Sequence, residues 1–184
     1  TDRLNDLVNN LLLSARLDTS WQPVLEPCDV AGSAARLVDE LQQRHPDRVL
    51  VLHAPEALPV LQADCDAMEI VLRNLLENAL KYAPAPSPVE LSIQTDPAGK
   101  QLVIEVRDEG PGVPDEEKSR IFEKFYRPGN EETRASKGTG LGLYIVRQIV
   151  TAHGGTIEVV DNKPHGARFI IKLPVPPPTK THAK

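Results

Sequence analysis

The sequence predicts a two-layer α/β sandwich, in which a mixed, largely antiparallel sheet packs on helices and a helical fragment precedes it. A length of 184 residues corresponds to one domain with a sizeable core plus a fragment, at roughly 150 residues per domain. Residues 89–93 and 102–106 alternate apolar and polar side chains, which is typical of half-buried strands. The 17 prolines leave four windows in which helices can form, at 1–22, 28–45, 60–83 and 129–163.

The first part of the chain contains two helices and two short strands in this prediction. Apolar residues recur at helical spacing over 2–18. A short helix with so much apolar surface needs a packing partner, and we expect part of that partner to lie outside this sequence. Residues 20–27 form a proline-punctuated linker, after which Asp29 or Ser33 caps a helix that runs to about 45. Short strands are expected at 49–53 and 58–62.

The second part begins with a strong helix over 65–83, which Pro84 ends. The two alternating strands follow, joined by a turn at 96–99, and a glycine-rich, charged stretch occupies 108–140. The remaining predicted elements are a helix at 140–153, a hairpin of 156–161 and 167–173, and a disordered tail from Pro174.

Composition excludes several classes of protein. With 40% hydrophobic and 26% charged residues, the chain is neither a disordered tract nor a membrane span, which needs roughly 18 apolar residues in a row. A net charge of −5 argues against a general nucleic-acid binder. Cys28 and Cys65 are the only cysteines, too few for a disulfide scaffold, and they indicate a reducing compartment. Since the only methionine is Met68, we expect the chain to be part of a longer protein.

Glycines concentrate in one region, because six of the eleven lie between 110 and 142. The segment GTGLGL at 138–143 immediately precedes a predicted helix, so backbone N–H groups and the helix dipole favour an anion there. It is not a P-loop, since no Gly-Lys-Ser/Thr follows. The glycine count alone is equally consistent with a flexible loop.

A carboxylate follows a strand in the segment DEGPG at 108–112. An ionised Asp108 accepts hydrogen bonds only, so it suits a ligand amine such as the exocyclic amine of adenine. The alternative is an ordinary turn stabilised by the aspartate.

Four polar side chains share one face of the helix segment RNLLENALKY at 73–82, namely Asn74, Asn78, Lys81 and Tyr82. Asparagine is a mediocre helix former, so two on one face indicate either buried amides bonded to a loop or a hard-cation site. An amide oxygen can join phosphate oxygens and water around Mg²⁺.

The segment IFEKFYR at 121–127 combines aromatic and basic residues. Phe122 and Phe125 are expected to anchor a loop, while Lys124 and Arg127 project charge. Residues 118–137 contain six basic and three acidic side chains, which fits a solvated loop or a lid over a polyphosphate.

These four segments, in this order, resemble the N, G1, F and G2 boxes of the ATP-binding catalytic domain of bacterial two-component sensor histidine kinases. The resemblance extends over about 20–173, and residues 3–18 resemble the end of the second helix of the dimerisation and histidine-phosphotransfer domain. It implies the Bergerat ATP-binding fold and a division into 1–19, 20–173 and a tail at 174–184.

The resemblance also implies that ATP and Mg²⁺ are bound, and it assigns roles to residues. Asn78 would coordinate the metal, Asn74 would support the phosphate and water shell, and Asp108 would accept from adenine. Lys124 and Arg127 would meet the terminal phosphates, so these two and Asn74 form the predicted catalytic set. The other residues expected to contact the nucleotide are Lys81, Tyr82, Gly110, Gly112, Val113, Tyr126, Gly138, Thr139, Gly140, Leu141, Gly142 and Leu143.

The resemblance favours phosphoryl transfer over hydrolysis. Hydrolytic relatives carry a water-activating glutamate where this chain has Asn74, and Glu77 lies about 100° away from Asn78 on the helix. None of the five histidines lies in the family's phosphorylation motif, so the acceptor is expected in an absent dimerisation domain of the same protein. His153, at a helix end, is expected to be structural.

The resemblance further implies a response regulator as partner, no nucleic acid, and a homodimeric parent in the bacterial inner membrane with this part in the cytoplasm. The fragment alone would be a monomer. Two alternatives are a regulatory module that binds nucleotide without transfer and a serine kinase of the anti-sigma-factor type. The helix at 3–18 argues against the second.

Overall fold

The computed structural model describes residues 2–128 and 138–176. Its helices are α1 (Asp2–Thr19), α2 (Val30–Arg44), α3 (Cys65–Tyr82) and α4 (Gly142–Ala152), with a 3₁₀ turn at Arg120–Phe122. Its strands are β1 (Glu26–Cys28), β2 (Val49–His53), β3 (Leu61–Ala63), β4 (Pro88–Thr95), β5 (Gln101–Arg107), β6 (Thr156–Asp161) and β7 (Ala167–Pro174).

The five-stranded sheet has the order β2-β4-β5-β7-β6. The pairing of β2 with β4 is parallel, and the other pairs are antiparallel. Alternation sets the register: Leu91 lies opposite Val106, which in turn lies opposite Phe169, and all three are buried. The predicted two-layer sandwich with a mixed, largely antiparallel sheet is therefore confirmed.

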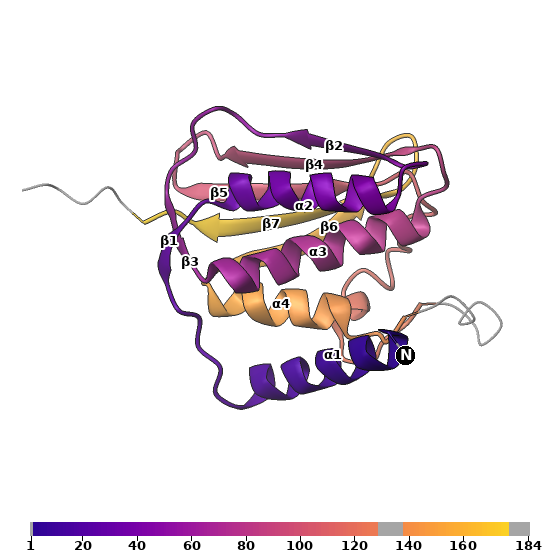
Figure 1. Cartoon of the computed structure of the whole chain (residues 1–184), viewed down its shortest axis with the longest axis horizontal. Helices are drawn as coiled ribbons and strands as arrows, with labels where there is room; N and C mark the ends of the chain where they lie inside the picture. Colours follow the sequence, from indigo (N-terminus) through magenta and orange to yellow (C-terminus); the bar gives the residue numbers. More distant parts are fainter. Residues whose placement is uncertain (1, 129–137, 177–184) are drawn as a thin grey trace, which may run out of the picture.

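One face of the sheet is covered by α2, α3 and α4 (Figure 1). Leucines and isoleucines from these helices meet the inward residues of the strands and form the hydrophobic core. The core includes Leu37 and Leu41 of α2, Leu72 and Leu76 of α3, Ile145 and Ile149 of α4, and Ile104 and Ile171 of the sheet.

Most predicted elements are present within a few residues of their expected bounds, and the differences arise from pairing. The expected linker contains β1, which pairs with β3, and β3 begins at Leu61 rather than at 58. β7 includes Pro174, and Val175 N donates to Lys100 O at 2.8 Å, so the expected tail starts later than predicted. The rest of that tail, 177–184, lies outside the described residues.

Cys28 and Cys65 form a disulfide, with their Cα atoms 5.5 Å apart. The sequence indicated a reducing compartment, and no signal in it pairs two cysteines that are 37 residues apart. The β1–β3 ladder places Cys28 opposite Leu61, four residues before Cys65 at the start of α3, so the two cysteines belong to neighbouring segments only in the folded chain.

Helix α1 lies beside α4, on the side away from α3 (Figure 1). Leu13 and Leu17 pack against the core, whereas Leu4 and Leu12 remain exposed. The predicted apolar helix thus buries only part of its apolar surface against the described residues. None of the described helices is long and apolar enough to cross a membrane.

Candidate nucleotide-binding site

The glycine-containing segments 108–112 and 138–142 lie against helix α3. A methyl group added to Gly142 would lie 2.7 Å from Asn74 Oδ1, and one added to Gly138 would lie 2.8 Å from Lys81 Nζ. One added to Gly110 would lie 3.0 Å from the carbonyl oxygen of Tyr82. Gly110 thus packs tightly on the backbone of α3, whereas Gly138 and Gly142 lie against the ends of the Lys81 and Asn74 side chains.

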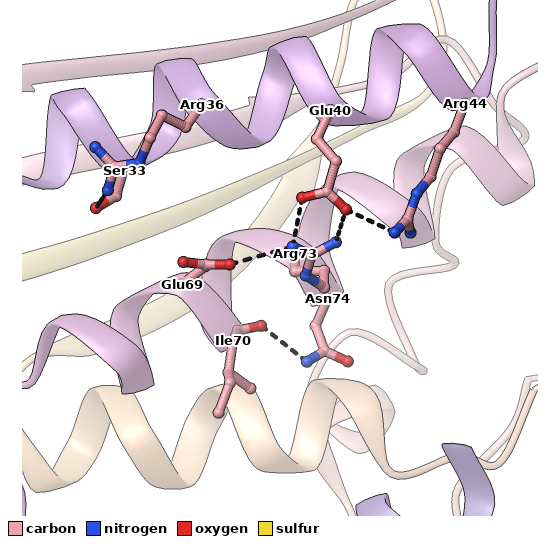
Figure 2. A network of polar contacts seen from close by, with 8 residues as sticks. All are labelled: Ser33, Arg36, Glu40, Arg44, Glu69, Ile70, Arg73 and Asn74. Atoms are coloured by element: carbon pink, nitrogen blue, oxygen red, sulfur yellow. Dashed lines mark hydrogen bonds and ion pairs between the residues drawn. The ribbon is translucent and has the colours of Figure 1, made fainter. Parts of the chain in front are cut away.

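An ion-pair network fixes α3 to α2 beside Asn74 (Figure 2). The guanidinium of Arg73 donates to both carboxylate oxygens of Glu40, at 3.0 and 2.9 Å, and to Glu69 at 3.1 Å. This bidentate arrangement fixes orientation as well as distance. Its hydrogen bond also lowers the pKa of Glu40.

The two asparagines of α3 differ in their hydrogen bonds. Asn74 donates its Nδ2 to Ile70 O at 2.8 Å (Figure 2), which leaves Oδ1 facing Gly142. Asn78 is half-buried, and its amide has no hydrogen bond to another described residue. The described residues include no group of three or more His, Cys, Asp or Glu that could hold a metal ion. The Asn78 amide oxygen is a group that can join phosphate oxygens and water around Mg²⁺.

Asp108 follows the last residue of β5 and is only 4% exposed. Its Oδ1 accepts from Gly110 N at 2.8 Å and from Ala167 N at 3.4 Å. Burial raises the pKa of this carboxyl, and the two backbone hydrogen bonds partly offset that effect. No described residue donates to Oδ2, so this second carboxylate oxygen can accept from a ligand amine.

Lys81 and Tyr82 lie at the C-terminal end of α3. Lys81 Nζ lies 3.2 Å from the Tyr82 hydroxyl and 4.7 Å from the centre of its ring. The Tyr82 side chain is 42% exposed, so a planar ligand can reach its ring. Arg48, which lies outside the four predicted segments, fixes this helix end by donating to Leu80 O at 2.6 Å and Ala83 O at 2.9 Å.

The aromatic and basic segment interlocks with the glycines that precede α4. Phe125 has a φ of 63°, and its N–H donates to Gly140 O at 2.9 Å. Gly140 has a φ of 71°, and a methyl group there would lie 2.8 Å from the Phe125 carbonyl carbon. Phe122 is buried, as predicted, but the side chain of Phe125 is 56% exposed. The prediction that both rings anchor the loop is therefore wrong for Phe125, which holds the loop through its backbone.

Lys124 pairs with α1 in this structure. Its Nζ lies 2.6 Å from Asp18 Oδ2, and the Tyr144 hydroxyl donates to the other oxygen of that carboxylate. These hydrogen bonds lower the pKa of Asp18 and raise the pKa of Tyr144 to about 12. The predicted phosphate-binding lysine is thus bonded to the helix that precedes the domain. Arg127 lies in the described part of the chain, but most of the expected lid, 129–137, lies outside it.

The N-terminus of α4 offers backbone donors. Its capping position, Leu141, has no side-chain cap hydrogen bond, so the first N–H groups of the helix are not capped by that side chain. The Leu141 side chain is itself fully buried, which leaves only its backbone for a ligand. Thr139 Oγ1 accepts from Leu141 N at 3.2 Å.

The other predicted contact residues mainly support the site. Val113, Tyr126 and Leu143 are partly buried against the core, and the Arg120 guanidinium stacks 4.4 Å from the Tyr126 ring. Gly112 has a φ of 76°, a conformation that glycine adopts without strain.

His153 has the structural role that the sequence predicted. It caps the C-terminus of α4, and its Nε2 accepts from Asp64 N at 3.0 Å. Its Nδ1 lies 2.7 Å from Ile149 O. Nε2 therefore joins the end of α4 to the cap of α3, and Nδ1 is used within α4. Glu77, which the sequence placed about 100° away from Asn78 on the helix, is exposed on α3.

The β6–β7 turn, which lies outside the four predicted segments, also contacts the site. Asn162 donates its Nδ2 to Asp108 O at 2.9 Å, and the backbone of Gly166 lies against Asp108. In the sequence, the only local sign of this contact was the glycine of the hairpin turn, Gly166.

Comparison with known proteins matches residues 63–177 to the family described as "Histidine kinase-, DNA gyrase B-, and HSP90-like ATPase". The probable sensor histidine kinase TcrY of Mycobacterium tuberculosis is 35% identical over 175 residues, which are 95% of this chain and 36% of TcrY. The sensor protein KdpD of Escherichia coli is 41% identical over 175 residues, 91% of this chain and 18% of KdpD. This chain thus spans about a third or less of the length of these relatives.

Two solved structures are also similar. Full-length ShkA in complex with AMPPNP has a TM-score of 0.81 and 31% identity, over 94% of this chain and 36% of ShkA. The mycobacterial sensor histidine kinase MprB has a TM-score of 0.70 and 30% identity, over 84% of this chain and 99% of the MprB chain.

Proposed function

We propose that this chain, which belongs to the histidine kinase-, DNA gyrase B- and HSP90-like ATPase family and within it to the sensor histidine kinases, binds Mg²⁺-ATP between α3 and α4. From there it would supply the γ-phosphoryl group to a histidine of a dimerisation domain, for relay to a response-regulator aspartate. The observation that carries the proposal is the close approach of Gly110, Gly138 and Gly142 to Tyr82, Lys81 and Asn74 of α3.

Recognition of adenine would depend on Asp108 and Tyr82. The free carboxylate oxygen of Asp108 accepts from the exocyclic amine, and the exposed Tyr82 ring lies against the base. Guanine carries a carbonyl at the corresponding position, which would face the carboxylate and repel it. The pocket should therefore prefer ATP to GTP.

The phosphates would lie along 138–142, where the N-terminus of α4 has no side-chain cap from Leu141 and the helix dipole favours an anion. Asn78 would hold Mg²⁺ together with phosphate oxygens, and the ion would neutralise charge on them. Lys81 lies beside Gly138 and would contact phosphate. Arg127, and Lys124 once it leaves Asp18, would meet the terminal phosphate.

Transfer is favoured over hydrolysis because Asn74 stands where the hydrolytic relatives carry a water-activating glutamate. Asn74 is a neutral amide that already donates to Ile70 O, and Glu77 is exposed. Phosphoryl transfer needs mainly positioning and charge stabilisation, which the residues named above supply.

The acceptor would come from another segment. His153 uses both ring nitrogens in structural contacts, and no histidine of this sequence lies in the family's phosphorylation motif. We assign residues 1–19 to the end of the dimerisation helix and 20–173 to the catalytic domain. The homodimeric parent, its place in the inner membrane and its response regulator are inferred from the relatives alone.

The test mixes this chain with a separately produced dimerisation domain and γ-labelled ATP. We expect acid-labile phosphate on the added domain, reduced by Arg127→Ala, and slow release of free phosphate by the chain alone. Calorimetry should show ATP bound in preference to GTP.

Three results would contradict the proposal. Acid-labile phosphate on the chain by itself would show that one of its own histidines is the acceptor. Acid-stable phosphoserine on an added protein would support a serine kinase. Tight ATP binding without transfer to any dimerisation domain would support a regulatory module.

A further inference from the structure

Asp108 is held from three directions by the strand and turn next to it. Its N–H donates to Ala167 O at 3.0 Å, and its carbonyl oxygen accepts from Asn162 Nδ2 at 2.9 Å. Its Oδ1 accepts from Ala167 N at 3.4 Å. The β6–β7 connection therefore restrains both the peptide group and the carboxylate of Asp108.

The turn that carries Asn162 is itself closed. Asn162 N donates to Gly166 O at 2.9 Å, so the two ends of the turn lie together. Gly166 has a φ of 109°, and a methyl group there would lie 1.9 Å from Asp108 O and 2.9 Å from Glu109 Cα. The backbones of the two segments are thus in direct contact, which only glycine permits.

The contact continues along the glycine-rich loop. A methyl group on Gly112 would lie 3.1 Å from Gly166 O, so the same turn also packs on the far end of 108–112. One short connection between two strands hence supports the whole segment that follows β5.

We propose that Asn162 is a positioning residue that sets base specificity, because it holds Asp108 in the orientation that recognises adenine. Asn162 acts through the Asp108 carbonyl and need not touch the nucleotide. This inference rests on the proposed function, since it requires that Asp108 reads the base. The side-chain amide of Asn162 is the only side-chain donor among the described residues that reaches Asp108.

Loss of this partly buried hydrogen bond removes one restraint on Asp108, so that its free oxygen is held less firmly in line with the ligand amine. A net contribution of about 1 to 1.4 kcal/mol for such a bond corresponds to roughly fivefold to tenfold in affinity. The loss should affect only ligands that carry the amine. Binding of phosphates, which depends on α3 and α4, should be unchanged.

The experiment measures dissociation constants for ATP, for ITP, in which a carbonyl replaces the exocyclic amine, and for tripolyphosphate. In Asn162→Ala we expect ATP affinity to fall roughly fivefold to tenfold, while ITP and tripolyphosphate bind as before. Asn162→Asp keeps the size but removes the donor, and any effect of its charge on phosphates cancels in the ratio of ATP to ITP affinity. His165→Ala, an exposed position of the same turn, is the control and should leave all three constants unchanged.

A merely structural role predicts a different pattern. If both Asn162 variants have a lower melting temperature and weaken the three ligands equally, or if they keep the wild-type ratio of ATP to ITP affinity, Asn162 does not position Asp108. If the wild-type chain itself fails to bind ATP, the proposed function fails instead. The wild-type measurement thus separates the two ideas.

Discussion

The substitution Gly142→Ala separates stability from nucleotide binding at this site. Gly142 is the first residue of α4, and an added methyl group would lie 2.7 Å from Asn74 Oδ1 and 3.6 Å from its Cγ. Since non-bonded heavy atoms settle at about 3.5 Å, the amide oxygen of Asn74 must retreat by about 0.8 Å. That oxygen is the group which we place beside the phosphates and metal.

The two consequences have opposite signs. Alanine is favoured over glycine within helices by up to about 1 kcal/mol, which corresponds to a rise of roughly 0–4 °C in the melting temperature of a chain this size. Loss of a hydrogen bond to a charged group costs about 1.5 to 3 kcal/mol, so we expect Mg²⁺-ATP binding to weaken by about tenfold or more. The variant should be as stable as the wild type and yet bind nucleotide poorly.

Gly32→Ala is the matched control. Gly32 lies in the first turn of α2, and a methyl group there would lie 2.2 Å from Oδ2 of the capping Asp29. The change is thus also Gly→Ala in a first helical turn against a polar side chain, but on a helix that holds none of the predicted nucleotide contacts. Loss of this cap costs about 1 kcal/mol, with no effect expected on ATP.

Titration calorimetry with and without Mg²⁺, together with thermal unfolding, measures both quantities. If Gly142→Ala binds Mg²⁺-ATP as tightly as the wild type, Asn74 does not lie at the phosphates. Equal weakening in both variants would mean that the effect is a general loss of structure.

Three further predictions concern groups in or near the site. Burial raises the pKa of Asp108, and its ionised form is the acceptor. As the pH is lowered, ATP affinity should therefore begin to fall at a higher pH than it would with an ordinary aspartate. Because the pKa is higher in the folded state than in the unfolded state, protonation of Asp108 stabilises the fold. Asp108→Asn should abolish that pH dependence in calorimetry, and an unchanged pH dependence would exclude Asp108. Asp18→Asn should lower the pKa of Tyr144 from about 12, as measured by phenolate absorbance, and should speed proteolysis after α1. The control Asp115→Asn removes an ion pair away from α1 and should have neither effect. Equal cleavage of the two variants would show that the Asp18 carboxylate does not hold α1. Cys28→Ser removes a cross-link over 37 residues, which stabilises the fold by about 4 kcal/mol through loop closure, so we expect a lower melting temperature. An equal melting temperature of the wild type with and without reductant would argue against the disulfide.

Local patterns in the sequence were sufficient to predict the architecture. Alternation over 89–93 and 102–106 placed the central strands because a strand buries every second side chain. Prolines ended the helices because they lack an N–H, and Asp29 is the observed cap of α2. The segments around Asn74, Asp108 and Gly140 were recognisable because their glycines and polar residues follow one another along the chain.

Contacts between distant residues were decided by tertiary structure alone. Lys124 was expected at phosphate, yet its partner is Asp18, 106 residues earlier, and Asn162 reaches Asp108 across 54 residues. Cys65 bonds to Cys28, which lies 37 residues earlier in the chain and on a strand paired with β3. Such pairs leave no periodic trace, because each depends on where two separate segments come to lie when helices and strands pack. Short-range patterns determine which element forms, and only the packed chain determines which exposed charge or turn faces the site.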